Sequence, residues 1–176
     1  MQLVNAVSLI LSVALPVGLG FLGSLAGDGG NSDWYKQLKK PPWTPPNWAF
    51  PVMWTILYVM MGVAAWYVWL HGGFEKQGVV LGVYLLQLFL NLLWTPLFFG
   101  MHNPGAAFAD IMLLWFTIAA NIYLFWHVEP VAAYLLVPYI IWVTLASTIN
   151  LYVWIHYVND SQYHVTNRPD LHSKSS

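Results

Sequence analysis

Five long apolar runs restrict what this chain can fold into. They lie at about Leu3–Ala26, Asn47–Leu70, Gly78–Phe99, Pro104–Trp126 and Val131–Tyr157, and none contains Lys, Arg or Glu. Each supplies the ~20 residues that a helix needs to cross ~30 Å of hydrocarbon. Because backbone groups in lipid must be satisfied within their own segment, we expect helices. The sequence therefore predicts an all-α integral membrane bundle of five transmembrane helices.

The composition points to the lipid bilayer as the main partner. Of the 176 residues 59% are hydrophobic and 7% are charged, whereas soluble domains carry about 25% charged residues. The formal net charge of −1 argues against nucleic acid as a partner, because phosphate binding needs clustered Lys and Arg. Without cysteine there is no disulfide and no thiolate site. No histidines fall at metal-ligand spacing and no phosphate loop is present, so neither a metal site nor a catalytic residue is expected.

Basic residues predict how the chain is inserted. Five of the six fall in the first loop or after the fifth run: Lys36, Lys39, Lys40, Arg168 and Lys174. Only Lys76 lies on the other side. The positive-inside rule then places the first loop and the C-terminus in the cytoplasm and the N-terminus outside. The first run lacks a basic start and a cleavage site, so we expect it to be retained as the first helix.

The expected organisation is one membrane domain over residues 1–159, followed by a polar, mobile tail over residues 160–176. The connection over residues 27–46 is the only long one within the domain. Ser32 is a helix cap and Asp33 suits the first turn of a short helix, whose last turn would carry Lys39 and Lys40. Pro41 then ends that helix. The segment is either a lid folded over the end of the bundle or an interfacial helix anchored at the headgroups.

Asp110 is the only acidic or basic residue within the five runs. Thr117 and Asn121 follow it on one helical face, so this stripe should face the bundle interior. Two interpretations remain open: a carboxylate that a neighbouring helix satisfies, or a group that transfers protons.

Other runs also place a large aromatic and a polar group on one face. The stripes are Gln87, Asn91 and Trp94; Trp54, Tyr58 and Met61; and Trp142, Ala146 and Ile149 with Asn150 close by. A pocket for a flat, largely apolar ligand needs this combination. Helix packing strengthened by Asn and Gln hydrogen bonds is the alternative.

Three stretches of the chain carry a specific pattern, and Asp110 lies between the last two. They are WYKQLKKPPWTPPNWAFPVMWTILYVMMG (Trp34–Gly62), LNLLWTPLFFG (Leu90–Gly100) and VPYIIWVTLASTIN (Val137–Asn150). In this order they resemble the TspO/translocator family, also called tryptophan-rich sensory proteins or peripheral benzodiazepine receptors. The resemblance implies a five-helix bundle with a lid-like first loop that contains a short helix, and often a homodimer.

The resemblance also implies a ligand and a site. Family members bind tetrapyrroles such as protoporphyrin IX and haem, sterols in some cases, and isoquinoline or benzodiazepine-type drugs; no obligatory cofactor is implied. Carried onto this chain, the ligand-binding positions are Ser24, Tyr35, Trp48, Trp54, Asn91, Trp94, Ala106, Asp110, Trp142, Ala146 and Ile149.

Two departures from the family pattern favour a bacterial cell membrane over the mitochondrial outer membrane. Ala106 stands where animal members have a Trp, and no Lys or Arg follows Tyr152 or Tyr157 closely enough to complete a cholesterol motif. The expected function is a membrane receptor or carrier for tetrapyrroles in a Trp-lined pocket. The alternatives are an enzyme that degrades porphyrin in light and oxygen, and a structural or interaction protein whose aromatics only pack.

Overall fold

The computed structural model describes residues 2–25 and 32–166, which form helices and the turns between them. Five long helices make up the bundle: α1 (Gln2–Ser24), α3 (Ala49–Trp69), α4 (Gly73–Thr95), α5 (Pro104–Val128) and α6 (Pro130–Thr166). All five are long and apolar enough to cross a membrane. The predicted all-α membrane bundle of five helices is therefore confirmed.

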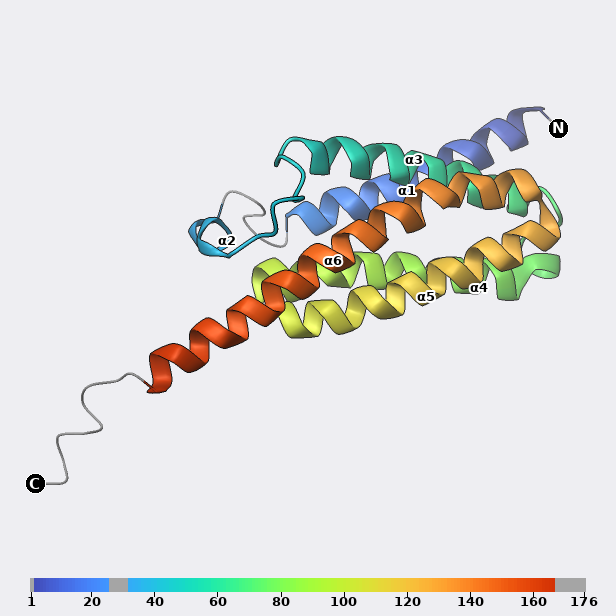
Figure 1. The fold of residues 1–176 in the computed structure, drawn as a ribbon. Helices are drawn as coiled ribbons and strands as arrows, with labels where there is room; N and C mark the ends of the chain where they lie inside the picture. Colours follow the sequence, from blue (N-terminus) through green and yellow to red (C-terminus); the bar gives the residue numbers. More distant parts are fainter. Residues whose placement is uncertain (1, 26–31, 167–176) are drawn as a thin grey trace, which may run out of the picture.

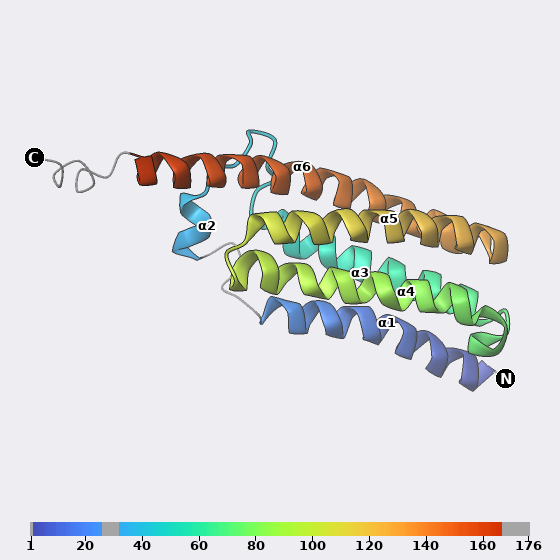
Figure 2. The same ribbon diagram turned by 90° about the horizontal axis from the view of Figure 1, so that it is seen from below.

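The helices pack in an order that leaves α1 at one edge. α1 contacts α3 and α4, α3 also contacts α4 and α6, and α5 lies between α4 and α6 (Figures 1 and 2). The short helix α2 (Asp33–Gln37) lies at the end of the bundle from which α6 projects (Figure 1). We call this the α2 end, and we call the end with the Leu70–Gly72 turn the opposite end.

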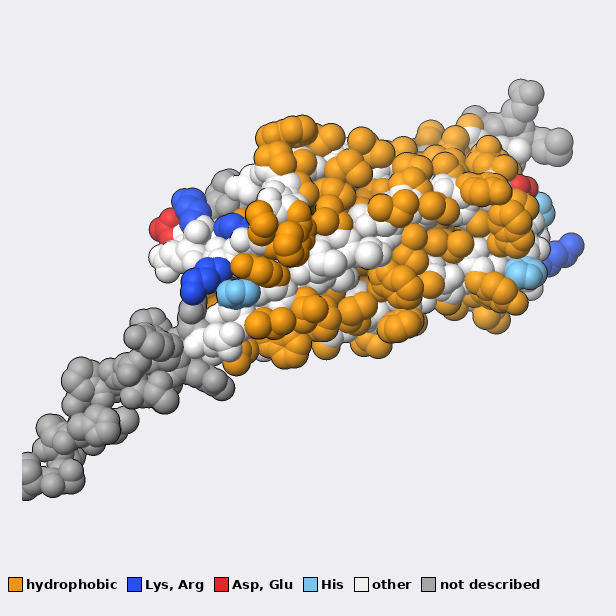
Figure 3. All heavy atoms as spheres, viewed as in Figure 1, with side chains coloured by type: hydrophobic (Ala, Val, Ile, Leu, Met, Phe, Trp, Pro, Cys, Tyr) orange, Lys and Arg blue, Asp and Glu red, His pale blue; other side chains and the backbone are white. Residues whose placement is uncertain are grey.

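The outer surface has the character expected of a lipid-facing one. Large apolar side chains such as Val4, Ile10, Val79 and Phe116 are well exposed. On the face seen in Figure 3 the side chains of Lys, Asp and Glu gather at the two ends, and the region between is covered by apolar groups. This distribution matches a hydrocarbon layer between two polar interfaces.

Close backbone contact joins α1 to α3. A Cβ atom on Gly62 would lie 2.5 Å from Val13 Cα and 2.7 Å from the Ser12 carbonyl oxygen, so only glycine fits there. Small residues at such crossings allow helices to approach within van der Waals contact of their backbones. Two GxxxG spacings in the sequence, Gly23–Gly27 and Gly78–Gly82, lie elsewhere. A Cβ atom on Gly78 or Gly82 would meet no atom within 4 Å, and Gly27 lies outside the described residues.

Three boundaries differ from the sequence prediction. The third span ends in a π-helical segment, η2 (Pro96–Gly100), because Pro96 has no N–H and crowds the preceding turn. α2 begins at the predicted cap, where Tyr35 N donates to Ser32 Oγ over 3.2 Å, but Leu38 is already extended. The expectation that Lys39 and Lys40 form its last turn is therefore wrong. α6 continues to Thr166, past the predicted end of the membrane domain at residue 159. The rest of the predicted tail, residues 167–176, lies outside the described residues.

Candidate functional site

A chain of hydrogen bonds crosses the bundle interior between α3, α4 and α6. The Tyr58 hydroxyl donates to Asn91 Oδ1 over 2.8 Å, and Asn91 Nδ2 donates to the Tyr139 hydroxyl over 3.0 Å. Tyr139 donates onward to Gln87 Oε1 over 2.9 Å, and Gln87 Nε2 lies 3.6 Å from Met61 Sδ. An amide has two N–H groups, so Asn91 keeps one donor that this chain does not use. These hydrogen bonds fix how α3, α4 and α6 are rotated around the buried amide of Asn91.

Two tryptophans border this hydrogen-bonded chain on its α2 side. Trp54 of α3 lies nearly parallel to Tyr58, with ring centroids 5.6 Å apart, and meets Tyr139 edge-on at 6.2 Å. Trp142 of α6 meets Phe50 of α3 edge-on at 5.7 Å. The indole N–H of Trp142 is buried and has no hydrogen-bond partner among the described residues. A buried donor without a partner costs free energy, and it is available to an acceptor that a ligand would bring.

Trp94 of α4 continues the aromatic surface toward α2. Its indole N–H donates to Asn150 Oδ1 over 2.9 Å, and its ring stacks on Phe98 at 4.9 Å. Asn150 Nδ2 donates to the Pro104 carbonyl oxygen over 2.8 Å, which ties α6 to the start of α5. Trp94 is therefore held in place by neighbours on α6 and η2.

Asp110 of α5 is buried, and neither of its carboxylate oxygens has a hydrogen-bond partner within residues 2–25 and 32–166. The interpretation that a neighbouring helix satisfies this carboxylate is therefore wrong. Its predicted stripe does face inward: Asn121 is fully buried and donates to the Val83 carbonyl oxygen over 3.3 Å, and Thr117 bonds within its own helix. Asp110 thus remains as a polar group with unused hydrogen-bonding capacity.

The arrangement offers stacking surfaces and a few hydrogen-bonding groups. In the part of the chain that the structure describes, no three His, Asp or Glu side chains come together as metal ligands would. What the residues can do is hold a flat apolar molecule between aromatic rings and meet its polar substituents with an amide, an indole N–H or a carboxyl group.

Comparison with known proteins identifies the family. The family model described as TspO/MBR matches residues 12–155, which is most of the chain and includes every helix of the site. The chain belongs to the TspO/MBR family.

Relatives from bacteria and animals agree with this assignment. The chain is 46% identical to tryptophan-rich protein TspO of Chlorobaculum tepidum over 147 residues, covering 80% of this chain and 92% of that protein. It is 44% identical to protein CrtK of Rhodobacter capsulatus over 124 residues, covering 69% of this chain and 76% of that protein. It is 41% identical to the translocator protein of Homo sapiens over 136 residues, covering 76% of this chain and 80% of that protein.

The residues carried over from the TspO/MBR family do not all lie together in the structure. Trp54, Asn91, Trp94, Trp142 and Ala146 lie in the interior between α3, α4 and α6, where the four apolar ones pack on a single core cluster and Asn91 bonds to two tyrosines. Tyr35 and Ile149 belong to a second cluster, together with Phe98, at the α2 end.

Besides Asp110, three of the predicted residues do not join either cluster. Ser24 is exposed, and its hydroxyl donates to the Phe21 carbonyl oxygen of its own helix. Trp48 is 69% exposed at the start of α3. Ala106 is half-buried in the first turn of α5, where its N–H donates to the capping side chain of Asn103. A family position thus does not by itself place a side chain inward.

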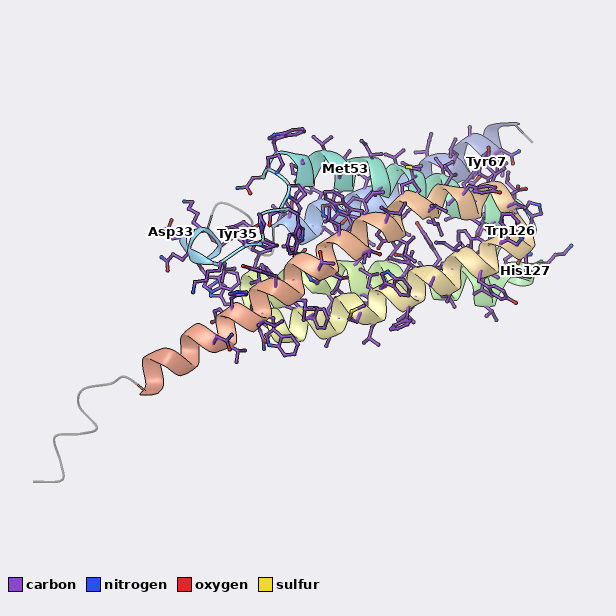
Figure 4. The ribbon with its side chains drawn as sticks, in the orientation of Figure 1. Asp33, Tyr35, Met53, Tyr67, Trp126 and His127 are labelled. Atoms are coloured by element: carbon purple, nitrogen blue, oxygen red, sulfur yellow. The ribbon has the colours of Figure 1, made fainter. Side chains whose placement is uncertain are left out.

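Tyr35 connects α2 to the bundle. In Figure 4 its side chain points toward the helices whereas that of Asp33 points away. Its ring packs against Phe98 and Phe99, and Lys40 Nζ lies 4.0 Å above the ring and donates to the Tyr35 carbonyl oxygen over 2.6 Å. Burial raises the pKa of the Tyr35 phenol and lowers the pKa of the Lys40 ammonium group. Tyr35 is therefore neutral at pH 7.

A separate groove lies between α1, α3 and α4 and includes none of the predicted residues. Its volume is about 230 Å³ and its lining is mostly apolar, with Ala65, Trp69, Phe74 and Leu81 among its residues. This volume is below the ~300–1,000 Å³ of typical small-molecule sites. The groove is therefore small for a large flat ligand.

Tyr139 is the residue that the sequence prediction missed. It is almost fully buried, bonds to both Asn91 and Gln87, and touches Trp54. Its position three residues before Trp142 was the available signal, because residues at i and i+3 share a helix face.

Proposed function

We propose that this TspO/MBR protein is a membrane receptor or carrier that binds a tetrapyrrole, such as protoporphyrin IX or haem, between α3, α4 and α6. The observation that carries the proposal is the interior cluster, in which Trp54, Trp94 and Trp142 pack on one core while Asn91 bonds to tyrosines of α3 and α6. A macrocycle offers large flat faces for the indole rings, and its polar substituents need a small number of hydrogen-bonding partners.

Two groups in the bundle interior support a ligand over packing alone. The Trp142 indole N–H and the Asp110 carboxyl group are buried without partners among the described residues. Packing alone would favour an apolar side chain at either position, because an unsatisfied buried polar group costs about 1–3 kcal/mol. A ligand that carries both acceptors and donors would engage them when it binds.

In this proposal α2 is the lid of the site. Tyr35 and Trp34 contact Phe98, and Phe98 stacks on Trp94. A ligand that displaces the aromatic side chains of the cluster would therefore press against the elements that hold α2. Trp48, which is exposed, would contact the ligand only at the entrance.

The proposed setting is a bacterial cell membrane, with the N-terminus outside and the α2 end at the cytoplasmic face. α2 and the end of α6 lie at the same end of the bundle (Figure 1), as the distribution of Lys and Arg requires. Sterols and isoquinoline or benzodiazepine-type drugs are secondary candidate ligands of the same cluster, and the proposed assembly is a homodimer.

Titration with protoporphyrin IX in nanodiscs tests the proposal. The shift of the porphyrin absorbance band is followed for the wild type and for Trp142→Phe and Asn91→Ala. Trp126→Phe is the matched control, because Trp126 is exposed at the opposite end, where its ring meets Tyr134 edge-on (Figure 4). We expect a saturable shift in the wild type. The porphyrin affinity should fall about ten-fold in the two site variants, the loss that ~1.4 kcal/mol of contact energy gives, and stay unchanged in the control.

A linear signal that is the same in all four proteins would show partition into the lipid and would reject the site. The same samples also address the enzymatic alternative. Under illumination in air, a porphyrin band that bleaches faster with protein than without it would identify degradation; equal rates would leave binding alone.

A further inference from the structure

Three histidines stack on or tilt against aromatic rings in the described part of the chain, and only one of these pairs joins two separate elements. His127 lies 4.5 Å from Tyr123 within α5, and His156 lies 4.0 Å from Tyr152 within α6. Both are spaced i, i+4 on a single helix. His102, in the turn between η2 and α5, stacks instead on Trp34 of α2, with ring centroids 4.3 Å apart and an angle of 16° between the planes.

The backbone of His102 is in the left-handed region. Its φ is +50°, and it is the only residue other than glycine with positive φ within residues 2–25 and 32–166. Left-handed backbone costs a non-glycine residue about 1 kcal/mol or more, and glycine would remove this cost. The turn carries an imidazole there, and the observed conformation places that ring flat on the indole of Trp34.

The imidazole of His102 differs in hydrogen bonding from those of the other pairs. Nδ1 of His127 and of His156 lies 2.8 Å from the carbonyl oxygen four residues earlier. The described residues form no such bond with a ring nitrogen of His102, and this residue is exposed. The stack on Trp34 is therefore the contact that holds the His102 imidazole among the described residues.

Protonation would change the strength of the stack. A cation above an indole face is attracted by the ring quadrupole, and tryptophan gives the strongest such contact. Trp34 is further held by edge-on contacts with Phe98 and Tyr157 at 5.4 Å and 6.2 Å, so its face stays turned to the imidazole.

The other charged and titratable groups around this contact are few. On α2, Asp33 and Lys36 form their own pair at 3.1 Å. Lys39 and Lys40 follow α2, and Lys40 is engaged with Tyr35. His156 and Tyr157 are the titratable groups of the adjoining part of α6. Histidine is the residue type whose charge ordinarily changes between pH 5 and 8. Of the two histidines here, His102 is the one stacked on Trp34.

We infer that His102 is a proton-operated latch on α2: its protonated imidazole holds Trp34 more tightly, so that acid slows the opening of α2 from the bundle. If the proposed site binds its ligand, the latch also slows entry and release of the ligand at low pH. Only this consequence rests on the proposed function. The latch itself acts without ligand.

Single-cysteine labelling measures the opening, because the chain has no cysteine of its own. Ala107→Cys places a thiol in the buried cluster that contains Tyr35, and Ala133→Cys places one in the interior of α6 near the opposite end. Maleimide labelling rates are measured in nanodiscs at pH 5.5 and 7.5. Dividing each rate by that of the His102→Phe variant at the same pH cancels the pH dependence of the thiol, because phenylalanine keeps the stack and removes the charge.

We expect the ratio for the Ala107→Cys reporter to fall about two- to five-fold from pH 7.5 to pH 5.5, the range that a cation–π contact at an exposed site gives. His102→Asn, which tolerates the same backbone conformation, should label faster than the wild type at both pH values. His127→Phe should behave as the wild type. A ratio that does not change with pH, or an equal change at the Ala133→Cys reporter, would overturn the latch.

The ligand arm separates this inference from the proposed function. Protoporphyrin IX dissociation is timed at the same two pH values in the wild type and in His102→Phe. Saturable binding, together with a labelling ratio that is the same at both pH values, would reject the latch and support the tetrapyrrole site. A pH-dependent labelling ratio without saturable binding would support the latch and reject the tetrapyrrole site.

Discussion

Asn91 on α4 and Asp110 on α5 are both buried polar side chains within membrane-spanning helices, yet their surroundings differ completely. Asn91 bonds to tyrosines from two other helices, whereas both oxygens of Asp110 lack partners among the described residues. In a membrane interior a satisfied amide joins helices, and an unsatisfied carboxyl group costs stability. The difference indicates that Asn91 joins helices and that Asp110 lowers stability; contact of either group with a ligand belongs to the proposed function.

The largest effect on stability should come from removing the residue at the centre of the hydrogen-bonded chain between α3, α4 and α6. Tyr139→Ala deletes one of the largest fully buried side chains and leaves both Asn91 and Gln87 with one partner fewer. We expect a loss of about 3–5 kcal/mol in the free energy of unfolding. Equilibrium unfolding in mixed micelles measures this loss. A value below about 1 kcal/mol would mean that the hydrogen-bonded chain does not join the helices.

A smaller change isolates the hydrogen bonds from the packing. Tyr139→Phe keeps the ring and removes the hydroxyl that bonds to Asn91 and Gln87. The expected loss is about 1–3 kcal/mol, because two buried polar groups each lose a partner. The same unfolding assay reports it, and a variant as stable as the wild type would contradict the structural role given to the chain.

Replacing the unsatisfied carboxyl group should act in the opposite direction. Asp110→Leu removes a buried polar group that no described neighbour satisfies, so we expect the free energy of unfolding to rise by about 1–2 kcal/mol. Porphyrin affinity should fall in the same protein. A variant that loses stability would show that Asp110 has a partner in the membrane, and the contrast with Asn91 would then fail.

The smallest effect provides the matched control for Tyr139. Tyr84 is similarly buried, but its hydroxyl has no hydrogen-bond partner within residues 2–25 and 32–166. Tyr84→Phe should therefore change the free energy of unfolding by less than about 0.5 kcal/mol, or stabilise the protein slightly. If both Tyr→Phe changes cost the same, hydrogen bonding does not distinguish the two phenols.

The sequence predicted the helices and their inward faces better than the contacts between them. Helical periodicity places Asn91 and Trp94 on one face, and in the structure Asn91 is buried and Trp94 packs on the core cluster. Periodicity within one helix does not say which residue of another helix lies at the same level. The pairing of Asn91 with Tyr139 and the isolation of Asp110 therefore could not be predicted from the pattern.

Local chemistry was predictable only where it depends on near neighbours. The Ser32 cap of α2 follows from residues within one turn, and the structure contains it. The π-helical turn at Pro96 was missed because a proline is compatible with a kink, a break or a wider turn. Ser24 and Trp48 were assigned by family position, and nothing in their own sequence context showed that they are exposed.

Photo-oxidation mapping tests the central claim most directly, namely that the ligand lies between α3, α4 and α6. Bound protoporphyrin IX is illuminated briefly in air, and the oxidised tryptophans are located by mass spectrometry. The account predicts that Trp54, Trp94 and Trp142 are modified before Trp126, and that excess haem protects them. Preferential oxidation of Trp69, in the groove between α1, α3 and α4, or equal oxidation of all these residues, would contradict it.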